Sequence, residues 1–149
     1  MRTQLWIDGS WRAGADGQVI SVSDPSSGEE IATVAAGSPA DAHAAVDAAA
    51  RAQPAWAAEP PRVRAEVLRA CFQTMIDHTD ELAELIVREH GKPFAEAKGE
   101  IAYAAEFFRW NSEEAVRIHG SIGSAPSGAN RVIVRHPPVG VVVLSLIHI

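Results

Sequence analysis

The stretch Val139-Gly140-Val141-Val142-Val143-Leu144 decides the fold class that the sequence predicts. Apart from Gly140 it is continuously apolar, which is typical of a strand covered on both faces in a parallel sheet flanked by helices. Residues 131–135, just before it, alternate between charged and β-branched side chains, as a half-exposed strand does. Pro137-Pro138 separates the two strands. The sequence therefore predicts an α/β protein.

Four helical stretches are expected upstream of these strands. Ser38-Pro39-Ala40-Asp41 supplies an N-cap serine, a proline at the first helical position and an acid in the first turn. The first helix is expected to end at Pro54, because proline interrupts a helical pattern. Helical spacing of apolar residues, together with stop residues, defines the set: Pro39 to about Gln53, Pro61 to about His78, Asp80 to His90 and Phe94 to His119. An apolar stripe at helical spacing marks the first helix and comprises Ala42, Ala45, Val46 and Ala49.

Two β-hairpins are expected before the helices. Asp8-Gly9, between residues 5–7 and 10–12, accepts the positive φ angles of a type I′ turn. Residues 19–23 and 30–34 flank a second turn, in which a proline and a glycine supply the required backbone angles. The N-terminal part of the chain is therefore expected to be built from strands.

Composition limits the class of protein and of partner. Hydrophobic residues make up 47% and charged residues 21%, which is enough apolar material for a globular core. The net charge of −6 argues against the basic face that nucleic acids require. There is no apolar leader, and no apolar stretch approaches the ~18 residues of a membrane span. The single cysteine, Cys71, fits a reducing compartment, so we expect a cytoplasmic protein without nucleic-acid or membrane partners.

The residues alone predict no catalytic group, no cofactor-binding residue and no metal ligand. The six histidines are scattered, and neither a dinucleotide-binding glycine motif nor a Walker loop occurs. Cys71 continues an apolar stripe formed by Val63, Val67 and Met75, where a cysteine acts as a small buried hydrophobe. Lys92 follows the end of a helix and is expected to be a solvated cation.

One aromatic stripe leaves two interpretations open. Tyr103, Phe107 and Trp110 recur at i, i+4 and i+7 of the longest expected helix, so they share one helical face. Such a stripe serves either core packing or the wall of a ligand channel.

Five segments, in the same order along residues 5–144, resemble the N-terminal part of aldehyde dehydrogenases. They are Trp6-Ile7-Asp8-Gly9 with Trp11; Asp24-Pro25 with Gly28-Glu29 and residues 31–34; Ala45-Val46-Asp47-Ala48-Ala49 with Pro54-Ala55-Trp56; Glu89-His90-Gly91-Lys92-Pro93 with Glu96-Ala97 and Glu100; and residues 131–135 with Pro138-Val139-Gly140-Val141. Residues 103–110 with 113–115 look most like the succinate-semialdehyde dehydrogenase branch.

The resemblance implies a truncated N-terminal part of the aldehyde dehydrogenase fold. Residues 1–120 would form N-terminal strands and helices of the cofactor-binding domain. Residues 121–138 would be a linker and the strand of an oligomerisation arm, with a turn-rich loop at 121–128. Residues 139–144 would be the first core strand of a Rossmann-like cofactor sheet, and residues 145–149 an atypical tail.

The resemblance also implies an activity for a full-length form. Such an enzyme oxidises a small aldehyde, here with succinate semialdehyde as candidate substrate, to a carboxylic acid. It uses NAD or NADP and passes through a cysteine thiohemiacetal. Tyr103 and Phe107 would border the substrate channel, and a homo-oligomer is expected. The catalytic residues would lie downstream, so this chain is predicted to be inactive alone.

The alternative function is that of a non-enzymatic interaction or oligomerisation module. A complete module should close its own core and satisfy its strand edges. A chain that stops directly after a strand of buried character favours the aldehyde dehydrogenase interpretation instead.

Overall fold

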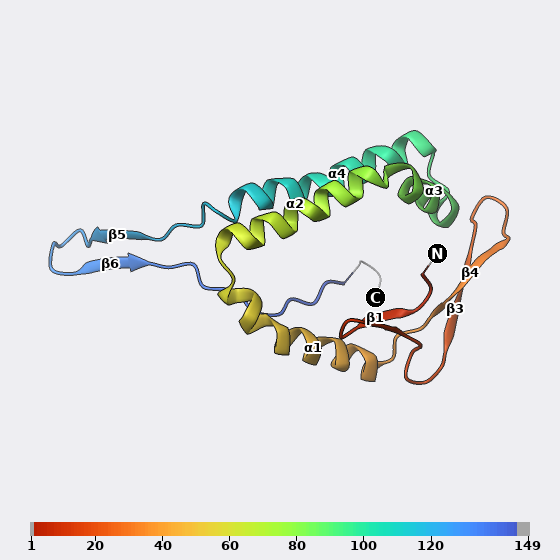
Figure 1. Ribbon diagram of the computed structural model, residues 1–149, viewed down its shortest axis with the longest axis horizontal. Coiled ribbons are helices and arrows are strands. Elements are labelled where there is room, and N and C mark those ends of the chain that lie inside the picture. Colours follow the sequence, from red (N-terminus) through yellow and green to blue (C-terminus); the bar gives the residue numbers. More distant parts are fainter. Residues whose placement is uncertain (1, 146–149) are drawn as a thin grey trace.

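A computed structural model describes residues 2–145 and shows three hairpins around four helices (Figure 1). The elements are β1 (Leu5–Ile7), β2 (Ser10–Arg12), β3 (Val19–Ser23), β4 (Glu30–Ala35), α1 (Pro39–Ala58), α2 (Pro61–Asp77), α3 (Thr79–His90), α4 (Phe94–Glu114), β5 (Ser121–Ser124) and β6 (Arg131–Val134). Among the described residues, each sheet is an antiparallel pair: β1 with β2, β3 with β4 and β5 with β6.

The first hairpin forms as the sequence predicts. Asp8 and Gly9 have φ angles of 53° and 74°, the left-handed values that a type I′ turn requires. Trp6 and Trp11 lie opposite each other across the two strands, with ring centroids 5.0 Å apart. An aromatic pair of this kind stabilises a short hairpin that has few backbone hydrogen bonds.

The third hairpin corrects the expectation that residues 121–128 form a loop. Ser121–Ser124 is strand β5, with Ser121 opposite Val134 and Ser124 opposite Arg131. Small residues left no apolar alternation to recognise, so the backbone pairing with β6 determines this strand. The hairpin projects away from the helices at the left of Figure 1.

The helices are confirmed, with two corrected ends. α1 continues through Pro54 to Ala58, because a proline removes only one intrahelical hydrogen bond and the alanine-rich residues around it favour helix. α4 ends at Glu114 rather than His119, and residues 117–120 lead into β5 without helical structure.

α2, α3 and α4 pack together and enclose the principal apolar core. α2 and α4 lie side by side, with α3 against one end of α4 (Figure 1). The buried apolar side chains of this unit are Ala65, Ala83, Ala97, Ile101 and Ala105. All but Ile101 are alanines, which lets the helix backbones approach closely.

α1 lies across from this unit, and its apolar stripe is not part of the core. The stripe, which includes Val46 and Ala49, is exposed. Asp41 is buried instead, and Ala44 and Ala48 are half-buried. The reason is that α1 packs against β1 through its N-terminal part, and no other helix of the described chain covers the apolar stripe.

Residues 135–145 run between α1 and the α2–α4 pair without strand pairing (Figure 1). The expected strand at 139–144 is therefore absent from the described chain. A strand is defined by a hydrogen-bonded neighbour, and no described segment pairs with this one. Val139 and Leu144 are 91% and 90% exposed. The expected atypical tail lies, apart from Ser145, outside the described residues.

Candidate functional site

The aromatic stripe of α4 forms the wall of a shallow pocket of about 310 Å³. Tyr103, Glu106, Phe107 and Trp110 line it. The rings of Tyr103 and Phe107 meet edge to face, with centroids 5.1 Å apart. Tyr103 is 68% exposed, and the other two rings are also exposed, so the stripe packs into no core of the described chain. The three rings therefore form an exposed apolar surface of the described chain.

The position of this wall follows from the opposite face of α4. Ala97, Ile101 and Ala105 are buried in the helical unit. Helical geometry then turns the residues between them outward. The buried alanines therefore determine which side of α4 presents the aromatic rings.

One ion pair belongs to the aromatic wall, and sequence reasoning missed it. Arg109 donates from Nε (3.0 Å) and Nη2 (2.8 Å) to the same oxygen, Oε1 of Glu106. The guanidinium also lies 5.6 Å from the ring centroid of Phe72 on α2. The hydrogen bonds to Glu106 raise the pKa of Arg109. The i, i+3 spacing of opposite charges was the signal available in the sequence.

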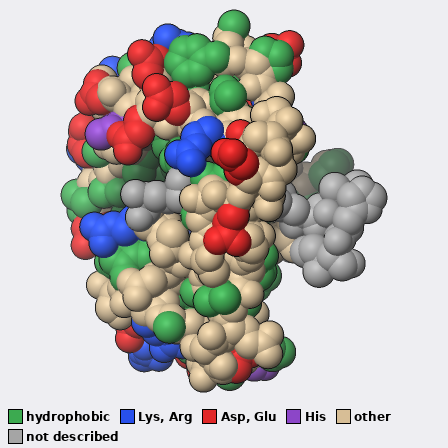
Figure 2. Space-filling model, turned by 90° about the vertical axis from the view of Figure 1, so that its right-hand side faces the viewer, with side chains coloured by type: hydrophobic (Ala, Val, Ile, Leu, Met, Phe, Trp, Pro, Cys, Tyr) green, Lys and Arg blue, Asp and Glu red, His purple; other side chains and the backbone are tan. Residues whose placement is uncertain are grey.

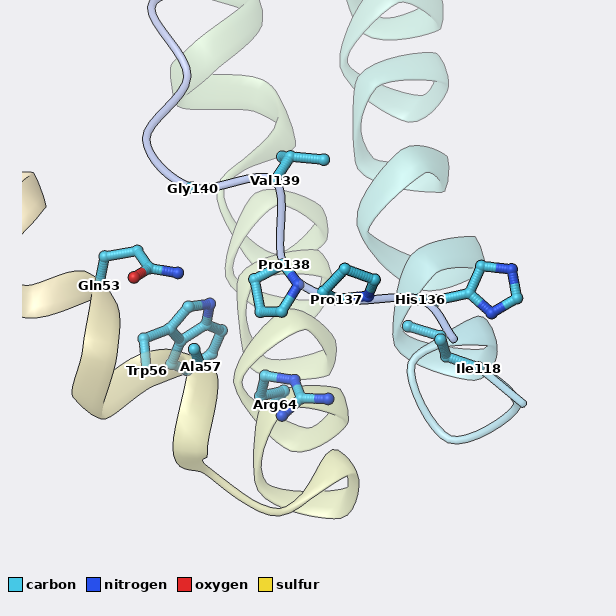
Figure 3. Close-up of a pocket in the computed structure, with 10 residues that line it drawn as sticks. All are labelled: Gln53, Trp56, Ala57, Arg64, Ile118, His136, Pro137, Pro138, Val139 and Gly140. Atoms are coloured by element: carbon cyan, nitrogen blue, oxygen red, sulfur yellow. The ribbon is translucent and has the colours of Figure 1, made fainter. Parts of the chain in front are cut away.

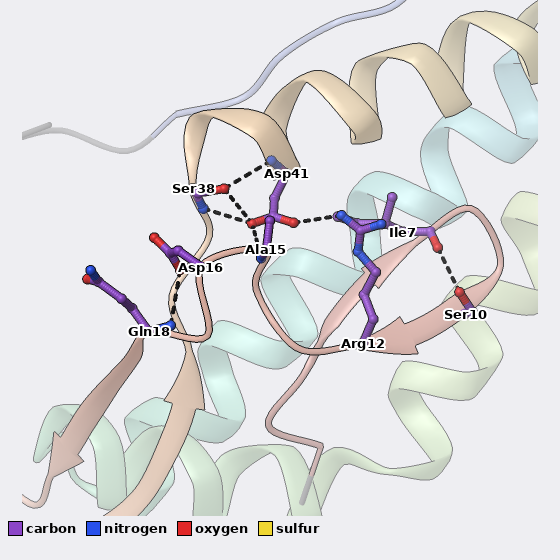
Figure 4. A network of polar contacts seen from close by, with 8 residues as sticks. All are labelled: Ile7, Ser10, Arg12, Ala15, Asp16, Gln18, Ser38 and Asp41. Carbon is purple, nitrogen blue, oxygen red and sulfur yellow. Dashed lines mark hydrogen bonds and ion pairs between the residues drawn. The ribbon is translucent and has the colours of Figure 1, made fainter.

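Asp41 connects the first hairpin, the following loop and α1 (Figure 4). Its Oδ1 accepts from Nη2 of Arg12 at 2.6 Å. Its Oδ2 accepts from the backbone N–H of Ala15 (2.9 Å) and of Ser38 (3.0 Å) and from the Ser38 hydroxyl (2.7 Å). These hydrogen bonds, with that of Ala15 first, hold the pKa of Asp41 well below its ordinary value of 3.8. The capping signal was readable in the sequence, but the burial of Asp41 was not.

The environment of Lys92 differs from the one that the sequence predicts. Lys92 was expected to be a solvated cation, but its side chain is only 27% exposed and forms an ion pair with Glu100. The hydrogen bond from Lys92 lowers the pKa of Glu100. The pair joins the turn after α3 to the first half of α4. Gly91 in that turn has a φ of 71° and lies against Pro25 of the β3–β4 turn. This junction fixes where α4, and with it the aromatic wall, begins.

Cys71 is a free, half-buried thiol on α2. Val63 and Val67, the earlier members of its predicted stripe, are exposed, so the stripe is only partly covered. Within residues 2–145, no group of three or more His, Cys, Asp or Glu side chains is arranged to hold a metal ion. No described helix is long and apolar enough to cross a membrane.

A second pocket, of about 460 Å³, lies where the chain passes between α1 and α2 (Figure 3). Trp56 of α1 lies close to Pro138, and Arg64 and His136 add polar groups at the edge. Further along, Val141 and Val142 lie beside the same end of α1. This pocket results from the packing of residues 136–142 on α1. Its lining residues include no serine or cysteine nucleophile.

One side of the molecule carries acidic and basic side chains in mixture, with hydrophobic groups between them (Figure 2). No large surface of a single sign is visible on this face. The aromatic wall of α4 is therefore the feature whose chemistry is most specific among the described residues.

Comparison with known proteins assigns the chain. The model of the aldehyde dehydrogenase family matches residues 11–145. Glutarate-semialdehyde dehydrogenase of Pseudomonas putida is 45% identical over 140 residues, and succinate-semialdehyde dehydrogenase [NADP(+)] GabD of Escherichia coli is 43% identical over the same length. Each alignment covers 94% of this chain and 29% of the relative.

The fold agrees with that assignment. The crystal structure of an E. coli NADP-dependent enzyme superposes with a TM-score of 0.84 at 42% identity, over 89% of this chain and 27% of that one. The described elements are thus an α/β arrangement like the N-terminal part of these enzymes. These matches favour an enzyme family over the alternative of a self-contained interaction module. The chain belongs to the aldehyde dehydrogenase family.

Proposed function

We propose that this chain is the N-terminal portion of an enzyme that oxidises an aldehyde to a carboxylic acid. NAD or NADP would accept the hydride, and water would supply the second oxygen of the acid. The observation that carries the proposal is the family match over residues 11–145. Succinate semialdehyde is the first substrate to test, because relatives named for semialdehydes align over nearly the whole chain.

The described residues do not themselves fit a dinucleotide. Such a cofactor needs a glycine-bearing turn after a strand, whose backbone N–H groups contact the pyrophosphate at a helix N-terminus. α1 follows β4, but its N-terminal groups are occupied by the Ser38 and Asp41 cap. We therefore assign cofactor binding and the nucleophile to residues outside this chain.

We propose that Tyr103 and Phe107 form part of the substrate channel of the full-length enzyme. Their rings offer an apolar surface that suits the hydrocarbon portion of an aldehyde. Their exposure supports this role, since neither ring is needed for the core of the described chain.

The test is a chimera in which residues 2–144 replace the matching part of the similar E. coli succinate-semialdehyde dehydrogenase. We expect it to reduce NADP with succinate semialdehyde, whereas the 149-residue chain alone gives no turnover. Turnover by the chain alone that is abolished by Cys71→Ser would overturn this assignment. A chimera that folds but oxidises no aldehyde would contradict the proposed function.

Phe107→Ala in the chimera tests the channel. We expect a KM several-fold higher, or a shifted substrate preference, with little change in thermal stability. Phe94→Ala is the matched control, because Phe94 is also an exposed phenylalanine of α4 but lies outside the pocket. Unchanged kinetics together with a large loss of stability would assign Phe107 to packing alone.

We also propose that the β5–β6 hairpin joins subunits in a homo-oligomer, and that the enzyme is cytoplasmic. The hairpin projects from the helices and exposes Ile122 and Ile133. A short strand pair with open edges is suited to pairing with another chain. Analytical ultracentrifugation of the chimera should show an assembly that Ile133→Lys weakens, and a monomer at all concentrations would contradict it.

A further inference from the structure

We infer that Glu106 makes the aromatic wall of α4 selective for charge. Relative to a neutral aldehyde of the same length, it raises kcat/KM a few-fold for an aldehyde whose far end is positively charged. It lowers kcat/KM a few-fold for one that ends in a carboxylate, so succinate semialdehyde stays a substrate but is held less well than its chain length alone would allow. The inference rests on the proposed function, since it specifies which substrates the channel wall admits.

The geometry places a carboxylate among three aromatic rings. Glu106 is three residues after Tyr103 and four before Trp110, so its side chain lies on the same face of α4 and lines the pocket with them. Apart from this carboxylate, the surface of the pocket is aromatic. A negatively charged group is therefore the one ionic feature of the wall.

Arg109 orients this carboxylate without taking its place in the pocket. Both hydrogen bonds from the guanidinium go to Oε1 of Glu106, and within residues 2–145 no hydrogen bond is recorded to Oε2. Arg109 also contacts the face of Phe72, on the neighbouring helix, and does not line the pocket. The positive end of the pair thus lies behind the wall and the negative end faces the substrate side.

The carboxylate and the faces of the aromatic rings act in the same direction on a charged ligand. The faces of aromatic rings are electronegative and attract cations. The Glu106 carboxylate attracts them as well and repels a substrate carboxylate. Because the site is partly open to solvent and Arg109 offsets some of the charge, each effect is a change of a few-fold rather than of orders of magnitude.

Three aldehydes with four-carbon chains separate these effects: succinate semialdehyde, butanal and 4-(trimethylammonio)butanal. They differ at the far end, which is anionic, neutral or cationic. The trimethylammonium group cannot donate a hydrogen bond, so it reports the electrostatic and cation–π attraction alone. The chimera described above is assayed for kcat/KM with each, and the values for the charged aldehydes are divided by the value for butanal.

We expect Glu106→Gln to raise the succinate semialdehyde ratio about fivefold and to lower the trimethylammonio ratio by a similar factor. Using ratios removes any difference in the amount of folded enzyme. Glu96→Gln is the matched control: it removes the same charge from an exposed position of α4 about 15 Å away along the helix, and it should leave both ratios unchanged.

Equal ratios in the parent and in Glu106→Gln would overturn the inference, as would a shift of the same size in Glu96→Gln. Failure of the proposed function would look different, because the chimera would then turn over none of the three aldehydes, butanal included.

Discussion

The two sides of this molecule differ in how much of their apolar surface they bury. α2, α3 and α4 bury a common core of alanines and Ile101 and hold their shape through contacts with one another. α1 and residues 135–145 present a valine, a tryptophan and the run at 139–144 to solvent. Both sides have sequences with apolar patterns typical of helices or strands. The difference is that only the first finds its partners within the described chain.

This contrast explains where apolar patterning predicts burial and where it does not. A pattern identifies a face that is suited to burial, but it does not specify which segment covers that face. For α4 the main covering segment is α2, which is separated from it in sequence only by α3 and two short turns. α1 and residues 139–144 cover one another only in part, and Val46, Val139 and Leu144 stay exposed. The relatives are more than three times as long as the aligned part. We expect further parts of the longer enzyme to cover these faces.

The largest effect should follow from overfilling the closed side. Ala105 is fully buried where α4 meets its neighbours, and Ala105→Leu would force those helices apart, at a cost of about 2–3 kcal/mol. Ala102→Leu is the control, since Ala102 is exposed on the same helix. Thermal unfolding followed by circular dichroism compares the two. Equal melting temperatures would show that the α2–α4 contact is not the stabilising core.

The junction that begins α4 should be the next most sensitive position. Gly91→Ala imposes a side chain at a φ of 71° and places its Cβ about 3.0 Å from Cγ of Pro25. We expect a loss of about 1–2 kcal/mol. Gly99→Ala should instead stabilise by roughly 0.5–1 kcal/mol, because Gly99 is helical and has open space around it. Urea unfolding that shows the same sign for both substitutions would contradict this account.

Asp41 joins α1 to the first hairpin and should make the chain sensitive to acid. Its pKa is lowered on folding, so the ionised carboxylate stabilises the native state. That stabilisation is fully present above the ordinary pKa of 3.8 and is lost progressively as the pH falls below it. Asp41→Asn should be less stable than the parent at neutral pH, and the difference should shrink in acid. A difference that stays constant from about pH 6 to about pH 2.5 would refute the linkage.

Local signals in the sequence accounted for most of the fold. The Asp8-Gly9 turn, the Ser38 cap and the stop at Gly91 act through neighbouring backbone atoms, so a single sequence contains the information. Pro54 shows the limit of such signals, because it was expected to end α1 and does not. The alanine-rich residues around it favour helix enough to offset the loss of one hydrogen bond. β5 could not be recognised, since its pairing with β6 depends on the backbone rather than on apolar side chains.

The candidate site divides in the same way. The spacing of Tyr103 and Phe107 on one helical face was readable, because helical geometry alone sets it. Which face α4 turns outward depends on the packing of Ala97 and Ala105 against the neighbouring helices. That packing could not be predicted from the sequence. Lys92 and Glu100 are eight residues apart, beyond the i, i+4 range, so their pairing appears only once the turn before α4 is folded.

The smallest effect on the stability of this chain should come from a substitution in the apolar run at residues 139–144. Val143 is 74% exposed, so Val143→Gln should change the stability of the 149-residue chain by less than about 0.5 kcal/mol. In the chimera the same change should cost about 2 kcal/mol or more if residues 139–144 form the first core strand of the cofactor sheet, because the amide would be buried without a partner. Thermal unfolding of the two proteins, each with and without the substitution, measures the difference. Equal small effects in both would mean that this run stays on the surface in the longer enzyme, and that its apolar character does not mark a strand of the sheet.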